Sequence, residues 1–229
     1  ATITNGTEGF RPVLATGSSV LSVAQADIKN PDGYTGFKDG LYLIKDIQNS
    51  NQWQFLDSVR GGNKAILSPS LAAEADYVTP SGTSISYCWN TPSTTTTNTD
   101  GTIESTISVN PTTGFSIISF TGNGVAGATV GHGLNTAPTQ FWLKPYEVDN
   151  SLFYVYDESI GNGSYLYLQS NAAAGADNIT YWNNTSPTNS VITLGSANNA
   201  AGTKYIIYAF TPVEGYSSFD SFTGNANAD

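Results

Sequence analysis

The sequence predicts an all-β protein made of two tandem β-sandwich repeats of about one hundred residues each. Three observations lead to this prediction. β-Branched and aromatic residues come in short runs bounded by turn residues. The 23 glycines and 10 prolines interrupt any longer helical pattern. Several short sequence motifs also recur at a separation of about one hundred residues.

Each apolar run has the length and composition of a β-strand. Turn-forming pairs such as Asp100-Gly101 and Asn162-Gly163 separate the runs. One strand with its turn therefore takes up roughly ten residues, a spacing that is typical of sandwiches. The best candidate strands are residues 41–44, 54–56, 84–89, 115–120, 141–143, 152–156, 165–168 and 205–210.

The internal repeat sets the expected domain organisation. The motif SFTGN occurs at 119–123 and again, letter for letter, at 221–225. Four further pairs of motifs follow in the same order in both halves, which indicates a duplication. They are 41–45 with 140–144, 57–61 with 157–161, 72–76 with 173–177, and 85–89 with 206–210.

The offset between the paired motifs shifts from 99–102 residues to 121 at the last pair, which predicts an insertion in the second copy. We place this insertion at about 178–199. The first sandwich is then expected over 1–90, with its N-terminal segment as a candidate attachment arm. A polar linker follows at 91–100, and the second sandwich spans 101–229. The last motif matches the start of a copy, which is consistent with a further copy in a longer polypeptide.

The charge balance excludes several classes of partner. The chain carries 18 acidic and 8 basic residues, a net charge of −10. Such a chain cannot neutralise a row of nucleic-acid phosphates or an anionic membrane surface. No apolar run approaches the length of a membrane-spanning helix. We therefore expect neither nucleic-acid binding nor membrane insertion.

The sequence contains no clear pattern for a catalytic site or a metal site. The single histidine, His132, has no zinc-site or triad pattern around it, and we expect it to bond to a backbone carbonyl in its glycine-rich turn. Asp57 and Asp157 hold equivalent repeat positions, which favours a turn or cap over a catalytic role. Asp- and Asn-rich loops offer oxygen ligands for Ca²⁺, although without EF-hand spacing. We expect a non-enzyme without a cofactor, with a bound calcium ion as the alternative.

Aromatic residues make up 12% of the chain and are the remaining candidates for a binding site. Trp182 lies in the inserted stretch among polar residues, where a binding loop would be grafted. Its ring and that of Tyr181 would offer apolar faces to a sugar, with amide partners from Asn183 and Asn184. The alternative is that Tyr181 and Trp182 form an extra strand packed on the sandwich.

Several segments together carry a family resemblance. They are residues 57–61 with 72–74, 84–89, 98–101, 114–133 with Leu134, Pro138 and Lys144, and 210–225. In these residues the chain resembles the tandem β-repeat proteins of tailed, especially marine, bacteriophages, which are tail-fibre-like or virion structural proteins. The resemblance covers roughly residues 28–225. The resemblance implies that the sandwiches are concanavalin-like or SPRY-like, and it assigns no catalytic residue. A jelly roll is the alternative type of sandwich for the predicted fold.

The leading hypothesis is a non-enzymatic phage virion protein, a fibre or surface-appendage subunit located on the particle and assembled in the host cytoplasm. Its expected partners are other virion proteins, copies of itself in a trimer by analogy, and host-surface polysaccharide. A carbohydrate-binding module centred on Trp182 and a capsid decoration protein are the alternatives. A polysaccharide depolymerase is a further alternative from a different class, and it would need a pair of carboxylates across a groove.

Overall fold

The computed structural model describes residues 9–15, 39–49, 52–61, 63–68, 72–92, 94–176 and 179–225. Within these ranges the regular elements are β-strands and two short 3-10 helices, so the all-β prediction is confirmed. No helix in these ranges is long and apolar enough to span a membrane. Residues 1–8 and 16–38, which include most of the candidate attachment arm, lie outside the described residues.

The first half of the chain contributes one antiparallel sheet of six strands. Their order across the sheet is β1 (Phe10–Ala15), β6 (Ser84–Asn90), β2 (Gly40–Asp46), β3 (Trp53–Asp57), β4 (Lys64–Ser68) and β5 (Ala75–Asp76). Strand β6 has alternating buried and more exposed residues, as expected for a strand whose two faces have different surroundings.

The second half forms an antiparallel sheet of eight strands and a two-stranded ribbon. The order in the sheet is β14 (Gly175–Ala176), β13 (Ser164–Tyr167), β12 (Tyr154–Asp157), β11 (Gln140–Pro145), β16 (Lys204–Phe210), β9 (Phe115–Thr121), β8 (Ser105–Asn110) and β7 (Thr96–Asn98). The ribbon pairs β10 (Thr129–Gly131) with β15 (Val191–Thr193). The helices are η2 (Glu158–Ile160) and η3 (Ser196–Asn198).

The two sheets share one pairing order. The order across the first sheet is β1, β6, β2, β3, β4 and β5. In the second sheet, the strands at the equivalent places are β9, β16, β11, β12, β13 and β14, and they are neighbours in the same order. The registers correspond as well, since Leu41 pairs with Asp57 in the first sheet and Gln140 pairs with Asp157 in the second. The pairing thus follows the motif pairs of the sequence. That each half forms a sandwich of its own stays a prediction.

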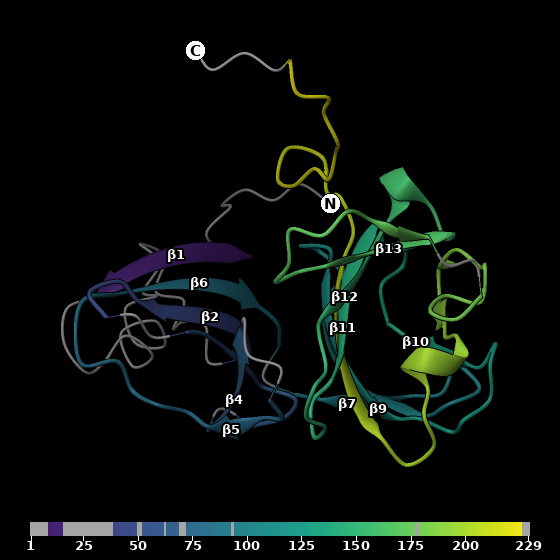
Figure 1. Cartoon of the computed structure of the whole chain (residues 1–229), viewed down its shortest axis with the longest axis horizontal. Helices are drawn as coiled ribbons and strands as arrows, with labels where there is room; N and C mark the ends of the chain where they lie inside the picture. The colour runs from purple at the N-terminus through teal and green to yellow at the C-terminus, as the bar shows by residue number, and fades with distance from the viewer. Residues whose placement is uncertain are drawn as a thin grey trace.

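The purple-to-blue sheet lies beside the teal-to-yellow one in Figure 1, and one face of each contributes to a common core. Residues of both sheets form a shared apolar core, which includes Leu41, Phe55 and Ile66 from the first sheet and Ile117, Ile206 and Tyr208 from the second. A second core lies on the opposite face of the eight-stranded sheet. Strands β9 and β16 are therefore buried on both faces, and β16 has the nearly continuous apolar sequence that this environment favours.

Two segments differ in detail from the sequence-based expectation. The stretch 91–100, expected to be a linker, contains the edge strand β7, which pairs with β8 through Thr96–Asn98. The described part of the inserted stretch, 179–199, is a folded layer rather than a loose loop. It supplies a turn around Trp182, strand β15 and helix η3 over the outer face of the second sheet.

Candidate functional site

The inserted stretch is anchored by Trp182, whose side chain is only 1% exposed. Its indole Nε1 donates a hydrogen bond of 2.9 Å to the carbonyl of Ser164 in β13. Its ring meets Phe141 edge-on at a centroid distance of 4.9 Å. Trp182 therefore offers no ring face to a sugar. The sequence-based expectation that Trp182 forms the binding platform is therefore wrong. The residues around Trp182 are polar, so the sequence gives no sign that its ring contacts the core.

Local backbone geometry explains why the chain turns so tightly here. Asn183 and Asn184 have φ of 51° and 49°, the left-handed region that asparagine tolerates better than most residues. The amide of Asn183 donates to the carbonyl of Ile179, closing the turn at 3.1 Å. These two asparagines thus have a structural role in the turn. Asn184 is exposed, and Asn183 is partly buried.

Tyr181 projects into a cluster of four tyrosines, which we call the tyrosine cluster: Tyr154, Tyr165, Tyr167 and Tyr181. Strand β12 supplies the first, β13 the second and third, and the inserted stretch the fourth. The Tyr181 ring lies 4.1 Å from that of Tyr165 and 4.7 Å from that of Tyr154. All four residues are partly buried, so each keeps part of its surface accessible to solvent.

The phenol groups of the cluster lie close enough to bond to one another. The Tyr167 hydroxyl donates to that of Tyr165 at 3.5 Å. This hydrogen bond, followed by burial, raises the pKa of Tyr167 to about 12. Burial, followed by the nearby Tyr154, raises the pKa of Tyr181 well above its usual value. Tyr167 and Tyr181 are therefore uncharged near neutral pH.

A glycine allows the cluster to lie against the edge of the sheet. Gly175 in β14 pairs with Tyr165, and a Cβ atom at position 175 would lie 2.3 Å from the Tyr165 ring. A side chain there would have to displace that ring. The position of Tyr165, and with it the contact to Tyr181, thus depends on the absence of a side chain at 175.

His132 has the structural role that its glycine-rich turn predicts. The Leu134 amide donates to Nδ1 at 3.1 Å, so the proton is on Nε2, which donates to the carbonyl of Thr188 at 3.1 Å. The ring is fully buried, and burial lowers its pKa. The predicted bond to a backbone carbonyl is confirmed.

Asp57 and Asp157 both organise turns, as their equivalent repeat positions predict. Asp57 Oδ1 accepts from the amides of Val59 and Arg60 at 3.0 and 2.8 Å. Asp157 Oδ1 accepts from the amide of Ser159 at 3.0 Å and caps η2. The turn role predicted for both residues is confirmed.

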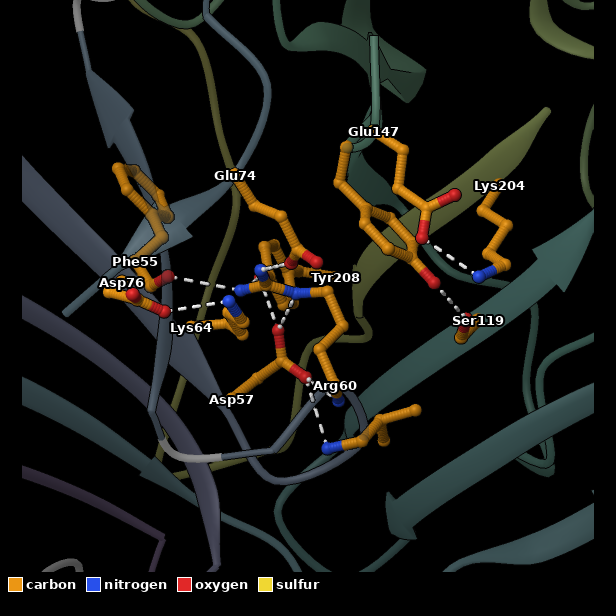
Figure 2. A network of polar contacts seen from close by, with 12 residues as sticks. Phe55, Asp57, Arg60, Lys64, Glu74, Asp76, Ser119, Glu147, Lys204 and Tyr208 are labelled. Atoms are coloured by element: carbon orange, nitrogen blue, oxygen red, sulfur yellow. Dashed lines mark hydrogen bonds and ion pairs between the residues drawn. The ribbon is translucent and has the colours of Figure 1, made fainter.

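Sequence reasoning missed a buried ionic network between the sheets, shown in Figure 2. Arg60 Nε donates to Asp57 Oδ2 at 2.6 Å, and its Nη1 donates to Glu74 at 2.8 Å. The Arg60 and Asp57 side chains are only 2% and 0% exposed. The signal available in the sequence was Arg60, three residues after Asp57, which has its equivalent in the second repeat copy at Asp157. The network reaches the second sheet through Tyr208, whose hydroxyl accepts from Arg60 Nη2 at 3.4 Å.

Metal binding gains no support from the parts of the chain that the structure describes. Within them, no group of three or more His, Cys, Asp or Glu side chains could hold a metal ion. Several carboxylates that could serve as ligands are already bonded, as Asp57 and Glu74 are to Arg60.

Residues 64–229 match the family DUF7483, described as a domain of unknown function. The match spans most of the chain, from β4 of the first sheet through the whole second sheet. No curated protein and no solved structure matches the chain.

Proposed function

The chain belongs to the DUF7483 family, and from its own residues we propose a non-enzymatic structural subunit of a phage virion. The subunit is part of a fibre or surface appendage and contacts host-surface glycans through the tyrosine cluster. The single observation that carries the glycan contact is this group of four partly buried tyrosines, whose rings and hydroxyls lie next to one another.

The chemistry of the cluster suits a neutral sugar. Pyranose rings present apolar C–H faces that pack on aromatic rings, and their hydroxyls exchange hydrogen bonds with phenols. The pKa values of Tyr167 and Tyr181 are raised, so these two phenols add no charge near neutral pH. With a net charge of −10, the chain repels acidic polysaccharides. Neutral glycans are therefore the ligand class that we propose.

The virion assignment draws on the composition and on the resemblance to phage repeat proteins. A chain with a single, fully buried cysteine folds without an internal disulfide, which suits assembly in a reducing cytoplasm. Its low content of charged residues, 11%, leaves an uncharged polar surface. Its partners in this proposal are other virion proteins, further copies of the chain and host polysaccharide.

The glycan contact is tested by calorimetric titration of the full chain with neutral host-surface polysaccharide. Tyr181→Ala removes one ring and one hydroxyl of the cluster and should weaken binding at least about tenfold. Tyr77→Ala is the matched control, because Tyr77 is a partly buried tyrosine packed on the outer core of the first sheet. Melting curves check that both variants fold.

The same samples test the non-enzymatic assignment. The proposal expects saturable binding and no release of reducing ends from the polysaccharide. Equal affinity for wild type and Tyr181→Ala would contradict the tyrosine site, and released reducing ends would contradict a non-enzyme.

The location is tested by labelling intact particles with an antibody against the chain and viewing them by electron microscopy. Label on tail appendages supports the proposed subunit. Label spread over the head would favour the capsid decoration protein instead, and unlabelled particles would contradict both.

A further inference from the structure

An aromatic cavity lies at the junction of the two sheets, and equivalent residues of the two repeat copies form its walls. In the first sheet, Phe10 of β1 pairs with Trp89 of β6, and in the second, Phe115 of β9 pairs with Phe210 of β16. All four residues line the cavity. By their places in the shared strand order, Phe10 corresponds to Phe115 and Trp89 to Phe210. The duplication therefore builds this cavity from two matching cross-strand pairs.

The rings of the two pairs lie close to one another across the junction. The centroid of the Trp89 ring is 6.1 Å from that of Phe210 and 6.4 Å from that of Phe115. Phe219, in the segment after β16, adds a further ring 5.8 Å from that of Phe210. The cavity measures about 370 Å³, within the range of about 300–1,000 Å³ that is typical of small-ligand sites. A ligand in it would meet rings from both sheets.

Hydroxyl side chains complete the lining of the cavity. They belong to Thr113, Thr211, Tyr216, Ser217 and Ser218. Thr211 Oγ1 donates to the carbonyl of Gly114 at 3.4 Å, and Ser218 Oγ donates to Asp220 at 2.7 Å. A hydroxyl oxygen that has donated its proton still has lone pairs with which to accept. The lining therefore favours a ligand that donates hydrogen bonds of its own.

The lining of the cavity is uncharged. No acidic or basic residue belongs to it, and burial raises the pKa of Tyr216 to about 12, so this phenol is neutral near pH 7. A charged ligand would lose its hydration here without gaining an opposite charge. A purely apolar ligand would leave the hydroxyl oxygens without a donor. A neutral sugar meets both conditions, because its C–H faces pack on rings and its hydroxyls donate to hydroxyl oxygens.

A strip of aromatic residues leads away from the cavity along the first sheet. Tyr87 lies two residues before Trp89 in β6 and so on the same face of the sheet. Its ring is nearly parallel to that of Phe10, at a centroid distance of 6.2 Å and an interplanar angle of 10°. The Trp53 ring of β3 follows, 5.8 Å from that of Tyr87 at 25°. Phe10, Tyr87 and Trp53 are all partly exposed, so the strip favours a chain of several sugar units over a single sugar.

The cavity is separate from the tyrosine cluster. Phe115 and Phe210 belong to the core between the two sheets, and Trp89 and Phe219 pack against it. The tyrosine cluster instead packs through three of its members on the core at the opposite face of the second sheet. A short glycan therefore cannot fill both sites at once.

We propose that this cavity binds sugar units of a neutral glycan, with neighbouring units of the same glycan on the strip formed by Phe10, Tyr87 and Trp53. This inference rests on the part of the proposed function in which the chain contacts neutral host-surface glycans. It adds a second contact for the same class of ligand, on the other face of the second sheet.

Calorimetric titration of the full chain with short oligosaccharides, cut from the neutral host-surface polysaccharide, tests the second contact. The wild type should bind at two sites, the cavity and the tyrosine cluster. Phe219→Ala removes one ring of the cavity and should weaken that site at least about tenfold, leaving one tight site. Phe222→Ala is the matched control, because it makes the same change three residues later, outside the lining of the cavity, and should bind like the wild type.

Phe10→Ala is a second cavity variant, on the other side of the junction, and should act like Phe219→Ala. Tyr181→Ala should keep the cavity site and lose the other. A chain that combines Phe219→Ala with Tyr181→Ala should retain no tight site. Melting curves check that each variant folds.

The outcomes separate this inference from the proposed function. Two tight sites in both cavity variants would overturn the cavity and leave the tyrosine site in place, as would a single wild-type site that Tyr181→Ala abolishes. A single site that both cavity variants abolish and Tyr181→Ala retains would support the cavity and contradict the tyrosine site. A wild type that binds no oligosaccharide would overturn both.

Discussion

The phenol of Tyr208 in β16 donates a 2.8 Å hydrogen bond to Oδ2 of Asp57, joining the second sheet to the first. Both residues are buried, and this interaction lies inside the shared apolar core. Burial, followed by the Asp57 charge, raises the pKa of Tyr208 well above its usual value, so the phenol remains a donor. Asp57 thus has two roles: it closes its own turn and holds the neighbouring sheet.

Replacing Asp57 by Asn should strongly destabilise the fold. The change removes the charge that balances Arg60, whose side chain is 2% exposed, and leaves Glu74 as its remaining carboxylate partner. Losing one partner of a buried ion pair typically costs about 3–5 kcal/mol. Urea denaturation of wild type and variant measures this difference in the free energy of unfolding.

Asp157→Asn is the matched control, because it makes the same change at the equivalent repeat position. Asp157 is partly exposed and caps η2, and asparagine caps helices about as well as aspartate, so the cost should stay within about 0.5 kcal/mol. Equal losses for the two variants would contradict the special role of Asp57.

The fold class could be predicted from the sequence because the strand signal is local. Alternation and turn residues act over ten residues or fewer, so short runs of the sequence are enough to indicate strands. The contact between the two sheets was also available in principle. Residues 205–210 are apolar at successive positions, which is typical of a strand buried on both faces.

The candidate site could be predicted only in part, because it depends on long-range contacts. The residues around Trp182 are polar, and nothing local shows that its ring meets Phe141 of a distant strand. Tyr181 was identified correctly as an aromatic residue of the insertion. Its neighbours Tyr154 and Tyr165 come from strands that the sequence assigns to the core, and only their pairing brings them together.

Stability should fall as the pH drops below about 6.5, because His132 is buried in its neutral form. Burial lowers its pKa in the folded state, and protonation of Nδ1 would break the hydrogen bond from Leu134. The unfolded chain takes up the proton first, so this contribution is complete above about pH 6.5 and is lost as the pH falls through the folded pKa. The slope should not exceed about 1.4 kcal/mol per pH unit.

Urea denaturation between pH 7.5 and 5.5 measures that slope, and His132→Gln is the comparison because the chain has no other histidine. The variant should be less stable at pH 7.5 and nearly independent of pH over this range. A wild type with no slope here would show that His132 is not held neutral.

Trp182→Ala should destabilise the fold by about 3–5 kcal/mol, because it empties a large buried site. Trp182→Phe should cost less, since it keeps an aromatic ring against Phe141 but loses the hydrogen bond to Ser164. Thermal and urea denaturation of both variants give the comparison. A stably folded Trp182→Ala chain that has lost only glycan binding would instead restore Trp182 as the binding platform.

Alkaline pH should weaken the fold through the buried phenols. Burial raises the pKa of Tyr208 and Tyr181, so the folded chain holds their protons at pH values where the unfolded chain releases them. A raised folded pKa gives stability that is complete below about pH 10 and is lost as the pH rises through the folded pKa. Ultraviolet absorbance near the phenolate band should show fewer ionised tyrosines in the folded chain than in the urea-unfolded chain at pH 11.

Tyr208→Phe isolates the interface contribution, because it removes the most deeply buried of these phenols while keeping its ring. If folded and unfolded chains titrate alike, the phenols are open to solvent and neither the interface bond nor the neutral tyrosine cluster holds.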